Sequence, residues 1–352
     1  MNQNNRTDFV IIGAGLTGLS LAKRLQEQGK DFLVLEARDR IGGRIHTIKT
    51  GNGANVECGA TWYFPHFKNL FKSLRDLKVR LKDQFMKGYT LYEYDETQEP
   101  RKILTRDESE MFRIEGGTGS IVESLHRSIG TDKVLLSERV SRIERTGSGV
   151  EVVSSGRVVH CQYVISTVPP QLLVSSVQLW PALPPSVSRV MASTHTWMGD
   201  SVKAIVTYTS PWWRDSNLSG GLYSNSGPVV QMYDQTDENG AALVGFLEDS
   251  MAEVSQEERR EAVISQLVRV LGPEAGQYLE YVDTAWKHEQ FTMPADSQRV
   301  ARHSNVGHQV YQEAHMEGRL YIGGTETSTV AGGFMEGAVN SANIIAEKIA
   351  NL

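Results

Sequence analysis

The first 36 residues carry the pattern that most constrains the fold of this chain. A short apolar run at residues 8–12 leads directly into G-x-G-x-x-G at residues 13–18. Apolar side chains then recur at helical spacing over residues 16–28, and a second apolar run at residues 32–35 is followed by Glu36. A strand, a glycine turn, a helix and a second strand ending in an acid together predict a βαβ unit that binds a dinucleotide.

Each glycine of this turn has its own task in holding phosphate. The first permits a tight turn, the second lets a pyrophosphate approach the backbone, and the third lets the helix pack against the strand. The helix N-terminus then presents free N–H groups to the phosphate charge. The turn residues expected to contact the cofactor are Gly13, Gly15, Leu16, Thr17 and Gly18. Glu36 is expected to accept hydrogen bonds from the ribose hydroxyls and to repel a 2′-phosphate, which disfavours NADP.

A second glycine pair lies just past the acid. Gly42 and Gly43 precede Arg44, whose guanidinium can bind a phosphate through two parallel hydrogen bonds. The run from Glu36 and Ala37 to Arg44 reads E-A-x-x-x-x-G-G-R, and it resembles the second signature of the FAD-dependent amine oxidase superfamily. The resemblance implies that the dinucleotide is FAD and that Ala37, Gly43 and Arg44 contact it.

Further segments resemble this family in the same order along the chain. Residues 57–62 are similar to the loop that runs under the flavin ring, and residues 116–120 to the family's G-G-x-G turn. Val140 falls where the family places a residue whose backbone meets the adenine, and residues 163–170 are similar to the return between its domains. The loop residues that the resemblance assigns to the flavin are Gly59, Ala60, Thr61 and Trp62.

The end of the chain carries the most diagnostic match. Residues 323–327 and 332–338 closely resemble the C-terminal signature of the family. The resemblance implies that Glu326 bonds a ribityl hydroxyl of the cofactor. A helix beginning near Met335 would direct its positive end at the flavin edge that gains negative charge on reduction. Phe334, directly before that helix, is expected to contact the cofactor as well.

Three residues are candidates for catalysis. Lys203 lies in a run of β-branched residues, an unusual place for a lysine unless it faces a polar site. The matching lysine of the family holds a water against flavin N5, and the tryptophan that matches Trp286 stands beside the flavin. Phe334 takes the place of one of the two tyrosines that steer the amine in monoamine oxidases, and the other tyrosine has no clear counterpart. No cysteine lies at that site either, so we expect non-covalent FAD.

The resemblance spans nearly the whole chain and implies its architecture. We expect the α/β class, with an FAD-binding Rossmann-type domain, similar to glutathione reductase, and an inserted mixed α+β substrate domain. The FAD-binding domain is expected to comprise residues 1–80, 117–192 and 289–352. The substrate domain is expected to comprise residues 81–116 and 193–288.

Local patterns predict several individual elements. Residues 65–82 have a mixed helical pattern, and residues 84–114 are polar and irregular with one strand. Residues 134–145 are strand-like over their whole length. A clear helical period covers residues 255–271 and ends at a Gly-Pro pair.

The signatures and Lys203 favour an amine oxidase, in which a hydride passes from the amine's α-carbon to flavin N5 and oxygen reoxidises the flavin to give hydrogen peroxide. The chain lacks much of a helical insertion that monoamine oxidases carry between Trp62 and Gly116. A second hypothesis therefore stays open, a flavoenzyme similar to protoporphyrinogen oxidases and desaturases that acts on an apolar C–C or C–N bond. The turn at residues 306–308 faintly resembles such enzymes. A third hypothesis is a flavoprotein without enzymatic activity.

Composition excludes other classes of protein. A formal net charge of −6 argues against nucleic-acid binding, which usually requires a basic surface. Neither a signal peptide nor a membrane anchor is evident, so a cytoplasmic, soluble protein is expected. The two cysteines, Cys58 and Cys161, form neither a disulfide framework nor a metal site, and no metal is expected. The expected partners are a small-molecule amine and molecular oxygen, and homo-oligomerisation is left open.

Overall fold

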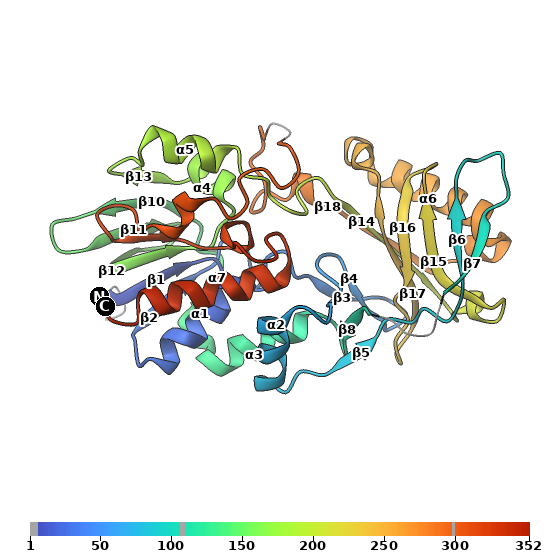
Figure 1. Ribbon diagram of the computed structural model, residues 1–352, viewed down its shortest axis with the longest axis horizontal. Coiled ribbons are helices and arrows are strands. Elements are labelled where there is room, and N and C mark those ends of the chain that lie inside the picture. The colour runs from blue at the N-terminus through green and yellow to red at the C-terminus, as the bar shows by residue number, and fades with distance from the viewer. Residues whose placement is uncertain (1–5, 106–109, 298–299) are drawn as a thin grey trace.

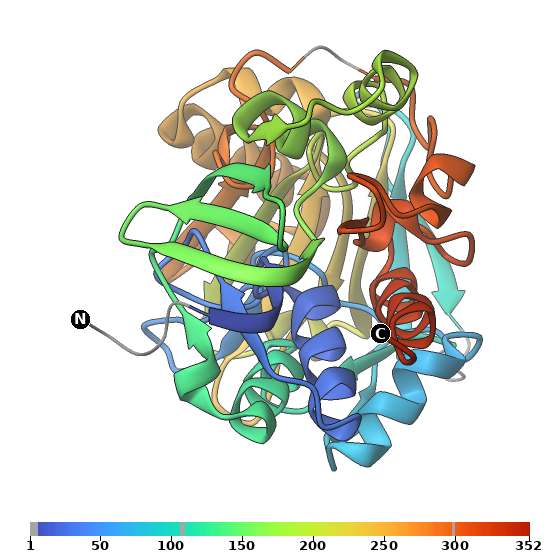
Figure 2. The same ribbon diagram turned by 90° about the vertical axis from the view of Figure 1, so that its left-hand side faces the viewer.

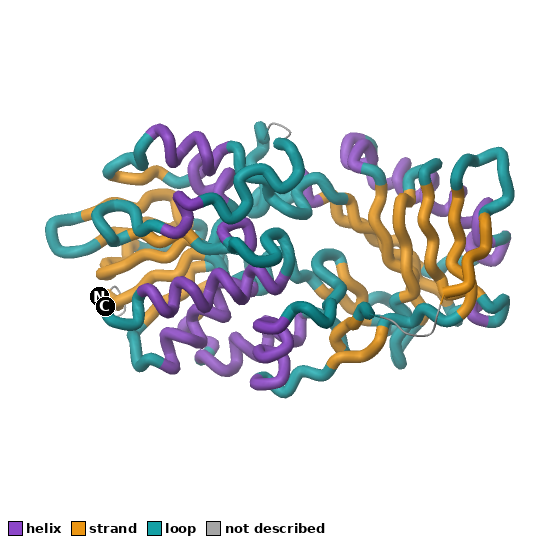
Figure 3. The backbone as a smooth tube through the Cα atoms, in the orientation of Figure 1, coloured by secondary structure: helices purple, strands orange, loops and turns teal. Residues whose placement is uncertain are grey.

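A computed structural model describes residues 6–105, 110–297 and 300–352 of the chain. Figure 1 shows two lobes side by side. The first lobe holds both chain ends and most of the helices, whereas a broad sheet dominates the second, as the strand and helix colours of Figure 3 make clear. The site lies between these two lobes, so the fold is described here for what each lobe brings to it.

The first lobe is built on an eight-stranded sheet in which parallel and antiparallel pairing meet on two strands. Its strands are β1 (Arg6–Ile12), β2 (Phe32–Leu35), β9 (Val134–Leu135), β10 (Val140–Arg145), β11 (Val150–Ser154), β12 (Val158–Ser166), β13 (Gln178–Trp180) and β19 (Leu320–Ile322). The strand β12 pairs in parallel with β1 and β19 and antiparallel with β11, and β10 pairs in parallel with β13 and antiparallel with β11. Ile12 stands opposite both Leu35 and Ser166, so these strands reach their carboxyl ends together. That edge is where parallel sheets bind ligands.

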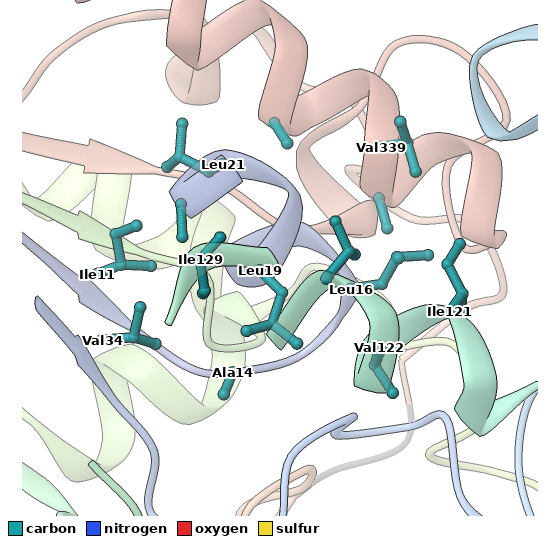
Figure 4. Packing of buried hydrophobic residues seen from close by; sticks show 14 of the residues in the cluster. Ile11, Ala14, Leu16, Leu19, Leu21, Val34, Ile121, Val122, Ile129 and Val339 are labelled. Atoms are coloured by element: carbon teal, nitrogen blue, oxygen red, sulfur yellow. The ribbon is translucent and has the colours of Figure 1, made fainter. Parts of the chain in front are cut away.

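Helices cover both faces of this sheet. On one face lie α1 (Leu16–Glu27), α3 (Gly119–Ile129) and α7 (Met335–Lys348), and α1 and α7 run side by side (Figure 2). Ile11, Leu19, Ile121 and Val339 belong to one cluster of buried hydrophobic residues on that face (Figure 4). The next residue toward the N-terminus, Val10, points to the opposite face, where α4 (Pro170–Ser176) and α5 (Pro185–Ala192) lie. Covering on both faces explains why the inner part of this strand, Phe9 to Ile12, is an unbroken apolar run.

The second lobe is a seven-stranded sheet backed by one long helix. Its strands, in spatial order, are β18 (Glu280–Ala285), β14 (Val202–Tyr208), β17 (Ala241–Leu247), β16 (Val229–Asp234), β15 (Leu218–Ser224), β6 (Gly88–Glu93) and β7 (Arg101–Thr105). The helix α6 (Gln256–Leu271) packs its apolar residues on one face of this sheet. The other face is turned toward the first lobe.

Smaller elements join the lobes. Two short ladders pair β3 (Thr47–Lys49) with β4 (Asn55–Glu57) and β5 (Leu81–Asp83) with β8 (Phe112–Ile114). The helix α2 (Lys68–Asp76) begins against α7, where the buried carboxylate of Glu336 accepts backbone N–H bonds from Asn69 (3.0 Å) and Leu70 (2.8 Å). One acid of α7 thus caps a second helix.

Some local predictions are confirmed and others are wrong. The helix over residues 255–271 is confirmed, and Ser255 and Glu258 form a capping box at its start. The helix over residues 65–82 is wrong in its length, because the chain turns at Lys78 with a φ of 56° and continues as β5. The prediction of a single strand over residues 134–145 is also wrong. A residue with positive φ separates β9 from β10.

In residues 84–105 and 110–114, the described part of the segment expected to hold one strand, there are three strands, β6, β7 and β8. Strands β15, β16 and β18 were not predicted at all. The second sheet draws its strands from residues 88–105 and 202–285, and the first from residues outside these two segments. We therefore propose the two-domain division, with an inserted substrate domain, on the basis of sheet membership.

Candidate active site

A cavity of about 340 Å³ starts at the carboxyl edge of the first sheet and ends on the second sheet. Among the predicted cofactor-binding residues, those that line it are Gly13, Gly15, Leu16, Thr17, Glu36, Ala37, Gly43, Arg44, Gly59, Ala60, Thr61, Trp62, Val140, Phe334 and Met335. Lys203 lines it too. Three of the predicted site residues do not line the cavity themselves: Gly18, Glu326 and Trp286. The structure therefore gathers residues as far apart in the chain as Gly13 and Met335 around one space.

The glycine turn has the close backbone approaches that its sequence predicts. Gly13 has a φ of +103°, and a Cβ there would lie 2.7 Å from the Thr167 hydroxyl oxygen. A Cβ on Gly18 would overlap the carbonyl oxygen of Gly13. The helix α1 begins after Gly15, and among the described residues no side chain caps its first amides. These N–H groups line the cavity as a cradle for an anionic group, which fits the pyrophosphate of FAD.

Glu36 ties this turn to the end of β2. Its carboxylate is buried and accepts N–H bonds from Ala14 (2.7 Å) and Arg38 (2.9 Å). Since each carboxylate oxygen accepts more than one hydrogen bond, capacity remains for two ribose hydroxyls. The acid thus fits the role predicted for it and also fixes the loop.

Arg44 and Glu326 form an ion pair that the sequence did not suggest. Arg44 Nη2 donates to Glu326 Oε2 at 3.0 Å, its Nη1 donates to Oε1, and Nη1 also donates to the carbonyl of Trp197 at 2.9 Å. The carboxylate is fully buried behind the guanidinium, which borders the cavity. Contacts of Arg44 with phosphate and of Glu326 with the ribityl chain stay predictions. The pair aims the guanidinium and balances its charge.

Lys203 is completely buried in the middle of β14. Its ammonium donates to the carbonyl of Gly59 at 2.8 Å and to the hydroxyl of Thr61. It also lies 4.5 Å from the Trp62 ring centroid and 4.7 Å from that of Phe246. Burial lowers the pKa of Lys203 to about 7, against the opposing attraction of a nearby carboxylate. A group that titrates near neutral pH therefore stands at the inner end of the cavity.

That carboxylate belongs to Glu57, which sequence reasoning did not single out. It is buried, and it accepts from Thr118 N at 2.6 Å and from the Thr47 hydroxyl at 2.8 Å. Burial raises the pKa of Glu57, and Lys203 opposes that rise. The available signal was an acid at the first position of the flavin loop, in the run E-C-G-A. Glu57 at the end of β4 and Lys203 in the middle of β14 thus both lie close to this loop.

Trp286 supports the flavin loop from behind. Its ring is fully buried and its Nε1 donates to the carbonyl of Cys58 at 2.8 Å. A Cβ on Gly59 would lie 3.2 Å from the ring. The expected place beside the flavin stays a prediction, and the contacts seen are those of a positioning residue for the loop.

Aromatic side chains form the mouth of the cavity. Phe334 is 39% exposed, and its ring centroid lies 5.8 Å from that of Trp197 and 5.7 Å from that of Phe67. Trp197 lines the cavity from the loop before β14, and its sequence carries no motif that could have identified it. Phe334 and Trp197 thus pack against each other in the lining of the cavity.

The inner end of the cavity lies on the second sheet. Trp62 packs edge-on against Tyr233, with ring centroids 4.9 Å apart, and donates from Nε1 to Gln84 at 3.0 Å. Gln231 and Phe246 complete this wall. Gln231, Tyr233 and Phe246 were missed because they lie on strands that only the folded sheet brings together.

Two further expectations concern residues away from the cavity. His308, in the turn that suggested a desaturase-like enzyme, accepts from Val310 N at 3.2 Å through Nδ1 and caps a short 3-10 turn. Cys58 and Cys161 are buried, unpaired thiols within the described part of the chain. In residues 6–105, 110–297 and 300–352, no helix is long and apolar enough to cross a membrane.

The fold and the cavity together define a class of protein. A glycine cradle, a buried acid at the end of β2 and a buried lysine at the far end of one cavity are the parts of an FAD-dependent oxidoreductase with two lobes. Comparison with known families is more specific. The family model described as flavin containing amine oxidoreductase matches residues 16–111 and 100–350. The chain belongs to this family of FAD-dependent amine oxidases.

Known proteins agree with this assignment. The chain is 25% identical to the flavin-containing amine oxidase A of Sus scrofa, over 99% of this chain and 86% of that protein. It is also 25% identical to the flavin-containing amine oxidase B of Cavia porcellus, over 99% and 87%. The first alignment runs over 460 positions, more than the 352 residues here, so the relative carries additional residues. The desaturase-like alternative is not favoured by these matches.

Solved structures share the fold. A putrescine oxidase bound to putrescine superimposes with a TM-score of 0.85 at 21% identity, over 98% of this chain and 99% of that one. The cyclohexylamine oxidase of Brevibacterium oxydans superimposes with a TM-score of 0.84 at 21% identity, over 98% of each chain. The α/β architecture predicted from the sequence, with an FAD-binding part and a substrate part, is confirmed.

Proposed function

We propose that this protein holds FAD non-covalently in the cavity and oxidises a monoamine with an apolar body. FAD, when bound, accepts the hydride from the amine's α-carbon and passes two electrons to oxygen, which becomes hydrogen peroxide. The imine left behind is hydrolysed to an aldehyde and ammonia. The observation that carries the proposal is the continuity of one cavity from the glycine cradle to Lys203.

The residues present fit FAD along this whole length. Glu36 and Val140 border the end suited to ribose and adenine, and the first turn of α1 borders the end suited to pyrophosphate. Thr61 and the N-terminus of α7 at Met335 lie farther along, where the flavin ring belongs. The positive end of that helix would stabilise negative charge on a reduced ring.

Lys203 holds a proton at the inner end of the site. Since its pKa is lowered to about 7 by burial, the ammonium and the neutral amine are both populated near neutral pH. It can therefore give or accept a proton through a water beside the reacting nitrogen, and its bonds to Gly59 and Thr61 fix its position.

The cavity wall around Lys203 disfavours substrates that carry a second positive charge. Trp62, Tyr233 and Phe246 supply aromatic surface, and Gln231 supplies an uncharged polar group. Among the described residues that line the cavity, the only carboxylates are Glu36 and Glu138, both on the first lobe. A diamine would bury its distal ammonium without a counter-charge, which is costly.

The test is the visible spectrum of the purified protein under anaerobic conditions. Flavin absorption bands that bleach with benzylamine, and hydrogen peroxide that forms when air is admitted, would support the proposal. Bleaching by putrescine but not by benzylamine would overturn the monoamine assignment. A colourless protein that fails to bind added FAD would overturn the cofactor assignment.

A further inference from the structure

A second cavity, of about 10 Å³ and here called the small cavity, lies at the start of the flavin loop. It is lined by Asn55, Glu57, Lys82, Arg113, Ile114, Gly116, Gly117, Gln235 and Asp237. Two strands that contribute to it, β4 and β8, lie between the helices of the first lobe and the broad sheet of the second (Figure 1). Its volume has room for about one water molecule, so it is too small for an organic ligand. Glu57 lines the small cavity and Gly59, two positions later, lines the large one, so one short segment borders both.

Arg113 brings a permanent positive charge to the small cavity. The residue is buried, and its Nη2 donates to the carbonyl of Thr236 at 3.1 Å. Within the described part of the chain, its buried Nε has no hydrogen-bond partner. Burial lowers the pKa of Arg113, and Asp234 and Glu57 are the first groups to oppose that change. Since a guanidinium stays protonated in proteins, this charge does not vary with pH.

The carboxylate of Glu57 is held in the form that carries a negative charge. It accepts from Thr118 N at 2.6 Å and from the Thr47 hydroxyl at 2.8 Å. Burial raises the pKa of Glu57, whereas these two hydrogen bonds and the attraction of Lys203 oppose the rise. Hydrogen bonds donated to a carboxylate favour its ionised form. The attraction between Glu57 and Arg113 acts in the same direction.

Lys203 depends on this carboxylate for its counter-charge. The two groups that accept from its ammonium, the carbonyl of Gly59 and the hydroxyl of Thr61, are both uncharged. A buried charge is costly unless an opposite charge offsets it. Burial lowers the pKa of Lys203, and Glu57 is the first group to oppose that change, ahead of Cys58. Burial raises the pKa of the Cys58 thiol to about 11, so that this group is neutral near pH 7.

Other titratable groups near Glu57 do not take over these roles. Tyr63 is fully buried, and its pKa is raised by burial and then by Glu57, so the phenol stays neutral. Lys82 lines the small cavity but is partly exposed, so solvent screens its charge more than that of Arg113. Burial and then Arg113 lower the pKa of Lys82. Asp237 accepts backbone N–H bonds from its own turn, including that of Asn239 at 2.8 Å.

We propose that Glu57 is a positioning residue for proton transfer, which keeps part of Lys203 in the ammonium form at neutral pH. Arg113 keeps Glu57 ionised from the small cavity, so that three buried charges of alternating sign control the reacting end of the large cavity. The consequence for the reaction rests on the proposed function. With Glu57 ionised, Lys203 can donate as well as accept a proton near pH 7. Without that charge it becomes a neutral amine, which can only accept one.

The experiment uses two substitutions that separate the charge of Glu57 from its shape. Glu57→Gln keeps the size of the side chain and removes the charge, whereas Glu57→Asp keeps the charge and shortens the side chain. The readout is a ¹³C NMR titration of purified protein with added FAD, labelled at lysine Cε, in which the Lys203 signal is identified by its loss in Lys203→Met. We expect Glu57→Gln to move the pH midpoint of this signal down by about one pH unit. Glu57→Asp should move it by less than half as much.

Two more variants complete the test. Glu115→Gln removes an exposed carboxylate that pairs with Arg80 at 2.8 Å, and it should leave the midpoint unchanged. Arg113→Gln should lower the midpoint, because Glu57 then takes up a proton more readily. If Arg113 acted on Lys203 only by direct repulsion, the midpoint would rise instead, and its part in the proposal would be overturned.

The pH profile of anaerobic flavin bleaching by benzylamine gives a second readout. In Glu57→Gln, the part of the profile that reports Lys203 should move by the same amount as the NMR midpoint. An NMR midpoint equal to that of wild type, or a larger change in Glu57→Asp than in Glu57→Gln, would overturn the role of Glu57. Failure of benzylamine to bleach the wild-type flavin would overturn the proposed function instead, because the NMR midpoint does not depend on turnover.

Discussion

Gly18 is the residue at which the cofactor loop tolerates a side chain least. A Cβ would overlap the carbonyl oxygen of Gly13 and lie 3.2 Å from the Thr167 hydroxyl oxygen. We expect Gly18→Ala to separate α1 from β1, to cost about 3 kcal/mol of stability and to abolish most FAD binding. Gly147→Ala is the matched control, since nothing lies within 4 Å of its Cβ position. Retention of flavin by Gly18→Ala after gel filtration would contradict the close packing of this turn.

We expect Lys203 to make the free energy of unfolding depend on pH, and a substitution of this residue can isolate its contribution. Its pKa is lowered by burial from 10.5 to about 7, so between these values the unfolded chain binds more protons than the folded one. The free energy of unfolding contributed by Lys203 should therefore rise with pH across that window and be smallest below about pH 7. Urea unfolding of wild type and Lys203→Met should show a stability difference that shifts in favour of wild type as pH increases.

A control for this measurement is Lys102→Met, at an exposed position of the edge strand β7. Its difference from wild type should be the same from about pH 6 to about pH 9, since an exposed ammonium meets similar solvent in both states. A pH-independent difference for Lys203→Met would mean that the buried group keeps one charge state throughout.

Among elements, α7 and α2 depend on a single carboxylate. Glu336 accepts bonds from the N–H groups of Asn69 and Leu70 and from the Asn69 side chain at 2.9 Å. Glu336→Ala would leave buried donors unpaired at the start of α2, and we expect a loss of about 2 to 3 kcal/mol in urea unfolding. Glu347→Ala removes an exposed carboxylate from the same helix and should cost less than about 0.5 kcal/mol. Equal effects would show that the cap carries no net stability.

Elements were predictable where their signals are local. The helix α6 has a cap, a regular apolar period and a Gly-Pro stop within its own sequence. Strand β15 has the sequence LSGGLYS, with a positive φ at Gly220 and a register shift before Leu222. Two glycines weaken a strand signal, and β15 forms because β6 and β16 pair with it on both sides. Pairing between distant segments is not visible in a window of sequence.

At the scale of the whole molecule, one end of the site carries local sequence signals, and the other end depends on pairing between distant segments. Its nucleotide end is built from contiguous motifs, so the glycine turn and Glu36 could be placed at the cavity from the sequence, and their contacts with the cofactor stay predictions. Its substrate end is assembled by the pairing of β16 with β17, which places Gln231 opposite Phe246. A lone glutamine or phenylalanine carries no motif, and only the completed sheet brings them to Lys203. The substrate side therefore had to come from the structure.

Because the cavity spans both lobes, we expect FAD to stabilise both of them. FAD should contact the glycine cradle of the first lobe and the Trp62 wall next to the second sheet, whereas ADP can fill only the first part. At about 100 times its dissociation constant, either ligand should add about 2.7 kcal/mol to the global stability. Only FAD, however, should slow amide hydrogen exchange in β16 and β17, because only FAD links their local opening to loss of a ligand contact. The measurement is exchange followed by mass spectrometry at matched saturation, with peptides from β1 and α1 as the control that both ligands protect. Equal protection of β16 and β17 by ADP would mean that the second lobe is stabilised through the protein alone and that the flavin end does not reach it.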